Sequence, residues 1–477
     1  MTSPRLTLFQ LAEILCGRLT GADADRPVAG LAIDTRKMEA YEVFFAVQGE
    51  NTDGHRFLNA AWEAGAAGAV VSADRQCEDI PELPLIHVDD PREALLRFAR
   101  WRIENWPGRV VGVTGSSGKT TTKEFIAALL RTRRKVFRTP GNLNNTLGVP
   151  LALFHLDDAD EMAILEMGMS SPGEIAALCG VAAPDIALVT NVGSVHLQFF
   201  PDRNALARAK EEIVQGMKPT GTFVCNTDDP LVMAMARRSS AAKLFFGTDP
   251  MADVRLLGWR VEDVDRMAGS LSWGGRIHRL RLGMTGVHAF MNLAAAVAVC
   301  LAAGLDDASI LEAAEALAPV GMRGAALRLA GGVRVLDDSY NSNPEAMRSV
   351  LTTLGAWEGR PETLLVAGEM RELGPGSADF HAEIGRRVAE LGNVRLVGVA
   401  GDAREMAAEA ERLGIPAEFH PDAAAATPAV IEAVRPGMLV VVKGSRGVGL
   451  ERIVRALEGS LGPDRTEAEQ STAEGGQ

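Results

Sequence analysis

The segment 110–124 carries a glycine-rich loop between a predicted strand and a predicted helix. Its first residues are β-branched, as in a buried strand, and the residues from Lys123 onward favour a helix. In the Gly-Ser-Ser-Gly turn between them, glycines allow backbone amides to approach an anion, and the helix N-terminus adds partial positive charge. Lys119 supplies a full charge and the Thr120 hydroxyl can reach a magnesium ion. The segment therefore predicts a nucleotide phosphate site.

The spacing within this loop is shorter than in the common P-loop. Two residues separate the glycines here, where the general motif has four. This spacing points away from GTPases and kinases and toward a narrower group of ATPases. The ATP-binding residues predicted in the loop are Gly115, Ser116, Ser117, Gly118, Lys119, Thr120 and Thr121.

Two polar residues follow predicted strands downstream of the loop. Glu166 ends the apolar run 162–166, and His196 follows the next apolar run, 186–190. In open α/β sheets, ligands gather at the carboxyl ends of strands, so both side chains are placed to face the phosphate loop. Magnesium prefers oxygen ligands, which suits Glu166. The alternative is a structural carboxylate and a hydrogen-bonded histidine, but their joint placement favours a metal site.

Two further segments contain polar residues that could serve either a binding site or only the fold. Lys210 lies within Arg-Ala-Lys-Glu-Glu, which composition alone assigns to a solvated helix face. Residues 337–344, Asp-Asp-Ser-Tyr-Asn-Ser-Asn-Pro, follow an apolar strand. Such Asp and Asn clusters before proline usually form turns, but at a strand's carboxyl end contacts to a ribose or a base are plausible.

Composition and charge place the chain among globular proteins. Its 477 residues suggest roughly three domains. The formal charge of −13 argues against nucleic acid as the main partner, because phosphate backbones require basic surfaces. The five cysteines are scattered without CxxC spacing, which argues against a zinc site or a disulfide framework. Without an export signal or a membrane span, we expect a cytoplasmic protein.

The fold class predicted is α/β with three domains. A small N-terminal α/β domain covers residues 1–107, and Trp-Pro-Gly at 106–108 marks its boundary. A central P-loop domain with a parallel sheet covers 108–320, and a Rossmann-like C-terminal domain covers 321–460. The polar stretch 461–477 is predicted to be a disordered tail.

Several of these segments together resemble the Mur ligase family. They are Thr-Gly-Ser-Ser-Gly-Lys-Thr-Thr-Thr-Lys-Glu at 114–124, Asp-Asp-Ser-Tyr-Asn-Ser-Asn-Pro at 337–344, Asp-Thr-Arg at 34–36 and Asn-Leu-Asn-Asn-Thr-Leu-Gly-Val-Pro at 142–150. Gly-Glu-Met-Arg-Glu-Leu-Gly at 368–374 and Lys-Gly-Ser-Arg at 443–446 are also similar. The resemblance extends to about Leu457 and lies closest to the branch that adds D-Ala-D-Ala. The Asp-Asn-Pro-Arg motif usual in ligases that add the third residue is missing.

The resemblance implies a function and its partners. It implies an ATP-dependent ligase that joins UDP-N-acetylmuramoyl-tripeptide to D-Ala-D-Ala through an acyl phosphate, in peptidoglycan precursor synthesis. The N-terminal domain would bind the UDP part. We expect a monomer, although the sequence leaves the oligomeric state open, together with the third residue of the tripeptide and the general base.

The resemblance also assigns roles residue by residue. It implies two Mg²⁺ positions, one involving Thr120 and Glu166 and the other His196 and a carbamylated Lys210, which stands fourteen residues after the histidine as in the family. Its catalytic residues would be Lys119, Arg323, His196 and Lys210. Its further ATP contacts would be Asn292, Arg323, Asp338, Tyr340 and Asn341. Its substrate contacts would be Thr35, Arg36, Asn145, Lys443 and Arg446.

The sequence departs from the family pattern at two places. Ala289 replaces an Asn in the motif that contains His288 and Asn292, and Gln198 replaces a Glu shortly after His196. The metal-facing histidine is retained, so the chemistry is expected to survive while nearby contacts differ.

Two alternative functions remain at this stage. One is a related amide ligase, such as a folylpolyglutamate synthase-like enzyme or a sister Mur ligase, against which the Asp-Ser-Tyr-Asn segment argues. The other is a P-loop protein that binds nucleotide without forming a bond. The set Glu166, His196 and Lys210 argues against it, because a simple binder needs no second metal.

Overall fold

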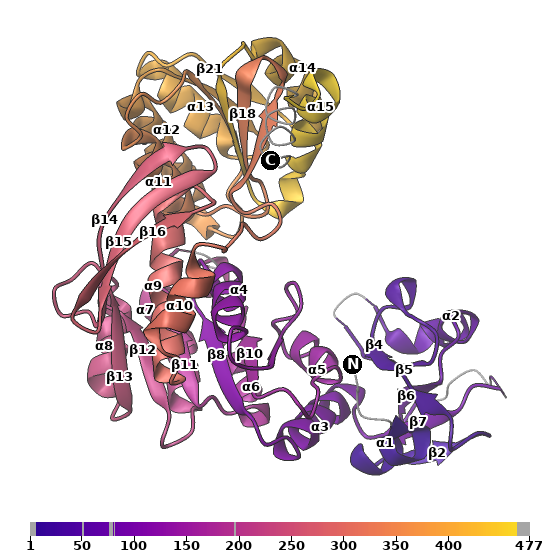
Figure 1. The fold of residues 1–477 in the computed structure, drawn as a ribbon. Helices are drawn as coiled ribbons and strands as arrows, with labels where there is room; N and C mark the ends of the chain where they lie inside the picture. Colours follow the sequence, from indigo (N-terminus) through magenta and orange to yellow (C-terminus); the bar gives the residue numbers. More distant parts are fainter. Residues whose placement is uncertain (1–5, 50–51, 76–79, 81, 195–196, 465–477) are drawn as a thin grey trace, which may run out of the picture.

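The computed structural model describes residues 6–49, 52–75, 80, 82–194 and 197–464. Within them the chain folds into three α/β units, arranged along the chain as Figure 1 shows. The N-terminal unit lies apart from the other two and joins the middle unit through α3 (Pro91–Glu104), which packs against α5 (Gly148–Leu153) and α6 (Glu174–Val181). The predicted α/β class with three domains is confirmed.

The N-terminal domain is built on a five-stranded sheet. Its strand order is β2-β7-β6-β5-β4, and β4 to β7 run parallel while β2 is antiparallel to β7. The helices α1 (Leu8–Ile14) and α2 (Leu58–Glu63) cover it. The strands are β1 (Leu6–Thr7), β2 (Arg18–Thr20), β3 (Pro27–Val28), β4 (Gly30–Ala32), β5 (Glu42–Phe45), β6 (Gly68–Ser72) and β7 (Leu85–Val88).

The middle domain holds a nine-stranded sheet, in the order β16-β15-β14-β13-β12-β11-β8-β10-β9 within the described residues. The central strands are parallel, as predicted. The strands are β8 (Arg109–Thr114), β9 (Val136–Arg138), β10 (Met162–Glu166), β11 (Ile186–Val189), β12 (Thr222–Asn226), β13 (Ala242–Gly247), β14 (Val254–Asp263), β15 (Arg266–Trp273) and β16 (Arg276–Leu282).

The far edge of this sheet was not predicted from the sequence. β15 pairs antiparallel with both β14 and β16, so three long strands extend the parallel sheet. They project at the left of Figure 1. The segment alternates charged and apolar residues, and its inward side chains complete a core that the parallel strands alone would leave open.

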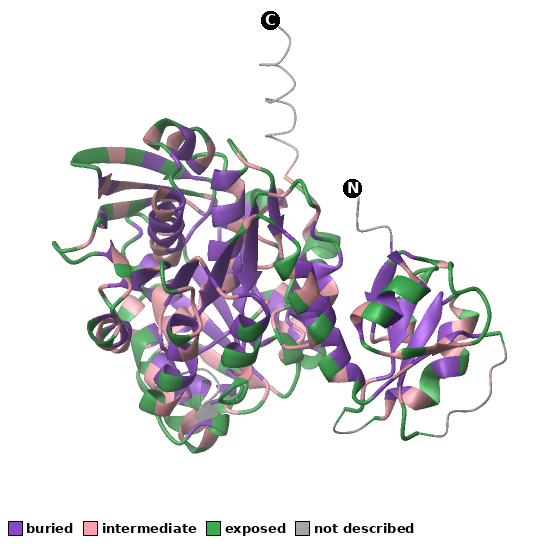
Figure 2. Ribbon diagram, turned by 90° about the horizontal axis from the view of Figure 1, so that it is seen from below, coloured by how far each residue is buried: buried purple, intermediate pink, exposed green. Residues whose placement is uncertain are grey.

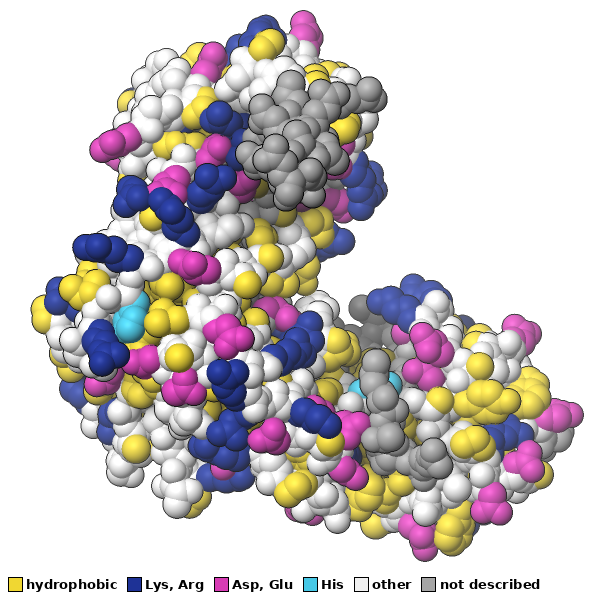
Figure 3. Space-filling model, in the orientation of Figure 1, with side chains coloured by type: hydrophobic (Ala, Val, Ile, Leu, Met, Phe, Trp, Pro, Cys, Tyr) yellow, Lys and Arg dark blue, Asp and Glu magenta, His cyan; other side chains and the backbone are white. Residues whose placement is uncertain are grey.

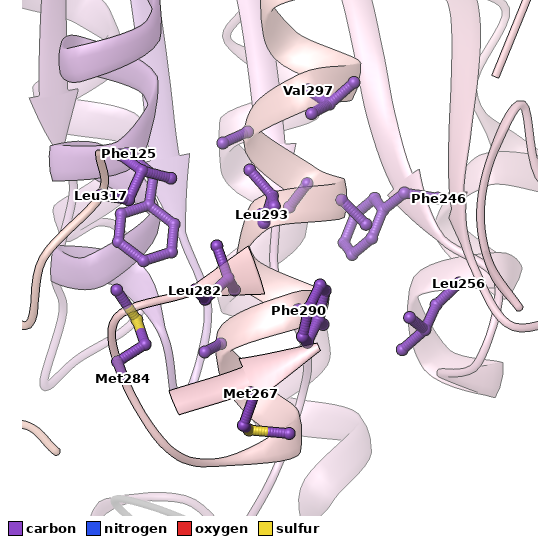
Figure 4. Close-up of a cluster of buried hydrophobic side chains, with 14 of the residues drawn as sticks. Phe125, Phe246, Leu256, Met267, Leu282, Met284, Phe290, Leu293, Val297 and Leu317 are labelled. Carbon is purple, nitrogen blue, oxygen red and sulfur yellow. The ribbon is translucent and has the colours of Figure 1, made fainter. Parts of the chain in front are cut away.

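One helix organises the core of the middle domain. Figure 4 shows α9 (Val287–Ala302) between α4 (Lys119–Leu130) and the strands, with Phe290 and Leu293 turned toward their neighbours. The run of alanines in α9 allows α4 and α9 to approach closely, and both are buried along much of their length. This packing fixes α4, whose first residue is Lys119. The remaining helices are α7 (Arg203–Gln215), α8 (Pro230–Arg238) and α10 (Asp307–Ala314).

The C-terminal domain is a six-stranded sheet in the order β17-β18-β22-β19-β20-β21. All its pairs are parallel except β17 with β18, which fits the predicted Rossmann-like unit. The strands are β17 (Ala325–Leu329), β18 (Val333–Asp338), β19 (Thr363–Gly368), β20 (Val394–Val399), β21 (Ala417–His420) and β22 (Leu439–Lys443). The helices are α11 (Pro344–Gly355), α12 (Ser377–Leu391), α13 (Ala403–Arg412), α14 (Ala423–Ala433) and α15 (Glu451–Leu461).

The chain after α15 stays attached to this domain for a few residues. The amide of Ala330 donates to the Gly462 carbonyl at 3.0 Å, and the Asp464 amide donates to the Arg328 carbonyl at 3.1 Å. The predicted tail at 461–477 is therefore hydrogen-bonded at its start, and the rest of it lies outside the described residues.

In Figure 2 the strands of each sheet form the buried interior, with exposed residues on the outer helices.

Two general predictions can be compared with this fold. No helix in the described part of the chain is both long and apolar enough to cross a membrane. The described cysteines are free, and burial raises the pKa of Cys179 and Cys225 to about 12, so these two behave as apolar core residues.

Candidate nucleotide and metal site

The loop between β8 and α4 has the backbone that its glycines predict. Gly115 has φ +146° and Gly118 has φ +82°, both in the region that favours glycine. A Cβ on Gly115 would lie 1.9 Å from Thr190 Oγ1, and one on Gly118 would lie 2.5 Å from Asn292 Oδ1. Both positions therefore require glycine for conformation and for space, and the predicted ATP contact Asn292 is packed directly against the loop.

Residues after β11 hold this loop from the side. Thr190 Oγ1 donates to the Ser117 carbonyl at 2.6 Å, and Asn191 Oδ1 accepts from the Ser117 amide at 2.9 Å. The amide of Ser116 donates to the Asn191 carbonyl at 3.0 Å. The loop is thus preorganised by hydrogen bonds. Thr190 and Asn191 were not predicted to be site residues.

Lys119 lies back over the phosphate loop. Its Nζ donates to the Gly115 carbonyl at 2.6 Å, at the centre of the site. Burial lowers the pKa of Lys119, the charge of Glu166 opposes this shift, and Arg323 reinforces it. An anion bound at the loop would therefore favour the charged amine.

Glu166 lies at the carboxyl end of β10, as predicted, with 2% of its surface exposed. Asn144 Nδ2 donates to Oε1 at 2.9 Å, whereas the buried Oε2 has no hydrogen-bond partner. The nearest cation is Lys123, whose Nζ lies 3.8 Å from Oε2. A buried carboxylate oxygen without a hydrogen bond is a suitable donor for Mg²⁺, so this residue fits the predicted metal role.

Thr120, His196 and Lys210 are the other residues with a predicted role in metal binding. Among the residues that the structure describes, no cluster of three His, Cys, Asp or Glu side chains could hold a metal ion. Thr120, at the start of α4, is buried and supplies a hydroxyl. His196 lies outside the described residues.

Lys210 is buried inside the middle domain, with 2% of its surface exposed, so its assignment to a solvated helix face is wrong. Burial and the charge of Lys119 lower its pKa well below the usual value, and no carboxylate among the described residues pairs with it. A sequence signal for this burial existed. Lys210 follows Leu206 by four residues and precedes Ile213 by three, so it lies on the apolar stripe of α7.

Arginine and tyrosine side chains from the C-terminal domain face the middle domain. The guanidinium carbon of Arg323 lies 3.8 Å from the centre of the Tyr340 ring, and that of Arg446 lies 5.8 Å from it. Such stacking orients a guanidinium and keeps its hydrogen-bond donors free along the edge. Arg323 is close enough to Lys119 to lower its pKa. Tyr340 lies near the phosphate loop, because Asn343, three residues later, donates to Ser117 Oγ at 2.8 Å. Contacts of Arg323 and Tyr340 with ATP stay predictions.

Lys443 has a different environment from the one its predicted role suggests. Its Nζ donates to Asp338 Oδ2 at 2.6 Å and to the Asn341 carbonyl at 3.1 Å, and it is 2% exposed. It therefore stabilises the turn after β18, which carries Tyr340 and the exposed Asn341. A direct contact between Lys443 and a substrate stays a prediction, as do the ATP contacts of Asp338 and Asn341.

The two departures from the family pattern are accommodated simply. Ala289 is buried in the core of α9, where an Asn side chain would need hydrogen-bond partners. Beside it, His288 Nδ1 lies 3.2 Å from Ser349 Oγ on α11. Gln198 is exposed, and its backbone amide donates to the Glu372 carbonyl at 3.4 Å.

Two further predicted substrate contacts lie in the N-terminal domain and just before α5. Arg36 is 86% exposed and forms two hydrogen bonds of 2.8 Å with Asp34, which caps the short helical turn η1 (Thr35–Lys37). Asn145 Oδ1 accepts from the amides of Leu147 and Gly148 at the start of α5. These are the local structural roles, and the binding roles stay predictions. Figure 3 shows the hollowed face between the N-terminal domain and the rest of the molecule.

Two residues missed by sequence reasoning complete the site. Lys123 is fully buried, and its Nζ donates to the Thr139 carbonyl at 2.6 Å and the Gly141 carbonyl at 3.1 Å. Asn144, which binds Glu166, belongs to the same loop. A fully buried lysine in a helix's first turns has no signature in composition, and only the fold brings this loop to Glu166.

Comparison with known proteins agrees with this architecture. Family models match 27–102 (Mur ligase family, catalytic domain), 113–300 (Mur ligase middle domain) and 322–446 (Mur ligase, glutamate ligase domain). The chain is 34% identical to the UDP-N-acetylmuramoyl-tripeptide–D-alanyl-D-alanine ligase of Bacillus subtilis, over 94% of this chain and 98% of that protein.

Solved structures of Mur ligases have the same overall fold as this chain. MurF from Acinetobacter baumannii superposes with a TM-score of 0.86 at 28% identity, covering 96% of this chain and 100% of that one. The MurF ligase from Thermotoga maritima in complex with ADP gives 0.79 at 30% identity, covering 90% and 97%. The phosphate loop, the buried acidic strand end and the three matched domains identify the chain as a member of the Mur ligase family.

Proposed function

We propose that the chain is an ATP-dependent ligase that adds D-Ala-D-Ala to UDP-N-acetylmuramoyl-tripeptide in peptidoglycan precursor synthesis. This proposal rests on the similarity, over 94% of the chain, to the Bacillus subtilis protein that is named for this activity. A relative solved in complex with ADP supports the binding of an adenine nucleotide. A cytoplasmic location is part of the proposal, because ATP is available there.

The reaction must activate a carboxylate, which is a poor electrophile. Transfer of the γ-phosphoryl group of ATP to the tripeptide carboxylate gives an acyl phosphate, and the amine of D-Ala-D-Ala then displaces phosphate to form the amide. Lys119, the loop amides and Arg323 are the groups placed to neutralise the transferring phosphoryl. The protein's contribution is positioning and charge stabilisation, and no protein nucleophile is needed.

The proposed Mg²⁺ ions would be held by oxygen donors around the loop. Thr120 and Glu166 would hold one, and the buried Oε2 of Glu166, which accepts no hydrogen bond, supports this. His196 and Lys210, as a carbamate, would hold the other. When bound, Mg²⁺ spreads the negative charge of the phosphates.

A carbamate on Lys210 is supported by its surroundings. Carbamylation requires a neutral amine, and burial beside Lys119 favours the neutral form. The modification would also place a negative charge near the Lys119 ammonium, and the two opposite charges attract each other. Lys210 would then supply oxygen atoms as metal ligands.

The substrate roles complete the proposal. Thr35 and Arg36 would contact the UDP part from the N-terminal domain, and Asn145 would contact the precursor from the middle domain. Lys443 and Arg446, on the loop after β22, would serve the substrate side of the C-terminal domain. The exposure of the Arg36 and Arg446 side chains, 86% and 54%, supports their availability to ligands.

The test is phosphate release by the purified chain with ATP and Mg²⁺. Release should require both UDP-N-acetylmuramoyl-tripeptide and D-Ala-D-Ala, and precursors ending in lysine or diaminopimelate should reveal the preferred third residue. L-Ala-L-Ala and glutamate are the matched control acceptors. Release that depends on glutamate would support a polyglutamate-type ligase, and nucleotide binding without acceptor-dependent release would support a simple binder.

A further inference from the structure

The C-terminal domain contacts the phosphate loop directly through Asn343. This residue is the N-cap of α11, and its Oδ1 accepts from the Ala346 amide at 2.8 Å. Its Nδ2 lies 2.8 Å from Ser117 Oγ in the phosphate loop. Because the cap commits the amide oxygen, the amide nitrogen must face Ser117, so the Ser117 oxygen accepts this hydrogen bond.

This contact fixes what the Ser117 hydroxyl can do. Its oxygen accepts from Asn343, which leaves the hydroxyl proton available as a donor. The loop backbone of Ser117 is already bound by Thr190 and Asn191. The side-chain proton is therefore the remaining donor of Ser117, at a loop built for phosphate.

A second contact sets the position of Asn343. Glu345, two residues later, accepts from the Ser194 amide at 3.1 Å and from Ser194 Oγ at 2.8 Å. Ser194 belongs to the same post-β11 loop as Asn191. The first turn of α11 thus contacts the phosphate loop and the loop that supports it, and both contacts join two domains.

We propose that Asn343 is a positioning residue that, on docking of the C-terminal domain, orients the Ser117 hydroxyl as a hydrogen-bond donor to the terminal phosphates of the nucleotide. This inference rests on the proposed use of ATP and adds a specific link between domain docking and the phosphate loop. In a molecule with the C-terminal domain undocked, the Ser117 hydroxyl has no such partner.

Asn343→Asp tests the proposal while keeping the fold. Aspartate is as good an N-cap as asparagine, so the helix and the thermal stability should be retained. The carboxylate then presents an acceptor to Ser117, which draws the hydroxyl proton away from the phosphate and adds a negative charge. We expect ATP affinity, measured by calorimetry, to fall on the order of 10- to 100-fold, because hydrogen bonds to charged groups are worth about that factor.

A double-mutant cycle separates positioning from general disruption. In a Ser117→Ala background, Asn343→Asp should lose the part of its effect on ATP affinity that acts through the hydroxyl, and only the repulsion from the added negative charge should remain. The matched control is Asp422→Asn at the N-cap of α14, which exchanges the same two residue types away from the site and should leave ATP affinity unchanged.

The result of these ATP-binding measurements can be told apart from a failure of the proposed ligase function. The readout is nucleotide binding, so it does not depend on which acceptor or precursor is correct. Wild-type ATP affinity in Asn343→Asp, or an equal effect with and without the Ser117 hydroxyl, would overturn the proposal. A loss of ATP affinity that is clearly smaller in the Ser117→Ala background would support it.

Discussion

Substituting Gly115 with alanine should damage the phosphate loop through one identifiable contact. The glycine has φ +146°, and the added Cβ would lie 1.9 Å from Thr190 Oγ1. Thr190 cannot remain in place, and its hydrogen bond of 2.6 Å to the Ser117 carbonyl would be lost. Strain of about 1–3 kcal/mol and a lost hydrogen bond of about 1 kcal/mol sum to roughly 2–4 kcal/mol.

The measurement is thermal unfolding followed by calorimetry, together with nucleotide affinity. For a domain of this size, roughly 2–4 kcal/mol corresponds to a fall of about 4–16 °C in the midpoint of the middle domain. ATP affinity should fall as well, because the loop amides shift. Both should be compared with Gly459→Ala, a glycine within α15 around which a Cβ meets no atom.

The same contact predicts the effect of substituting Thr190. Thr190→Ala alone removes one hydrogen bond and should cost about 1 kcal/mol. In the Gly115→Ala background it removes the clashing oxygen, so it should cost less or even restore stability. Additive effects of the two substitutions, or a Gly115→Ala protein with wild-type midpoint and affinity, would refute the contact as the cause.

Four further predictions follow from the site and the charged pairs. Lys119→Ala should lower turnover by orders of magnitude while the circular dichroism spectrum stays unchanged, and near-normal turnover would remove this lysine from the site. Arg36→Ala should raise the apparent KM for the UDP precursor with ATP affinity unchanged, and equal weakening of both would contradict the division between domains. Lys210→Ala should abolish activity, with partial rescue by short-chain carboxylic acids; mass spectrometry or high-resolution density that finds an unmodified Lys210 in the active enzyme would contradict the carbamate. Hydrogen bonds from Arg348 lower the pKa of Glu383 from 4.5 to about 2, so the pair stabilises the fold above pH 4.5 and this contribution is lost as the pH falls toward 2. Glu383→Gln should therefore flatten the loss of unfolding free energy in that interval, measured by urea titration, and an unchanged slope would mean that the pair does not contribute.

The sequence by itself determined the features that depend on local patterns. The β-branched run before the phosphate loop became β8, and the apolar run ending in Glu166 became β10 with the same bounds as predicted. Alternation of strands and helices gave the three α/β domains, because period and turn chemistry are properties of neighbouring residues. The glycine loop with its lysine could be recognised for the same reason.

The tertiary structure alone decided which distant residues meet. The burial of Lys210 depends on how α7 packs, and the pairing of Asn144 with Glu166 depends on the loop after β9 crossing to the end of β10. The contact of Asn343 with Ser117 joins residues 226 positions apart. Long-range contacts of this kind follow from sheet order and domain docking, which no local spacing encodes, so the chemistry of the loop could be read from sequence while the residues that orient it could not.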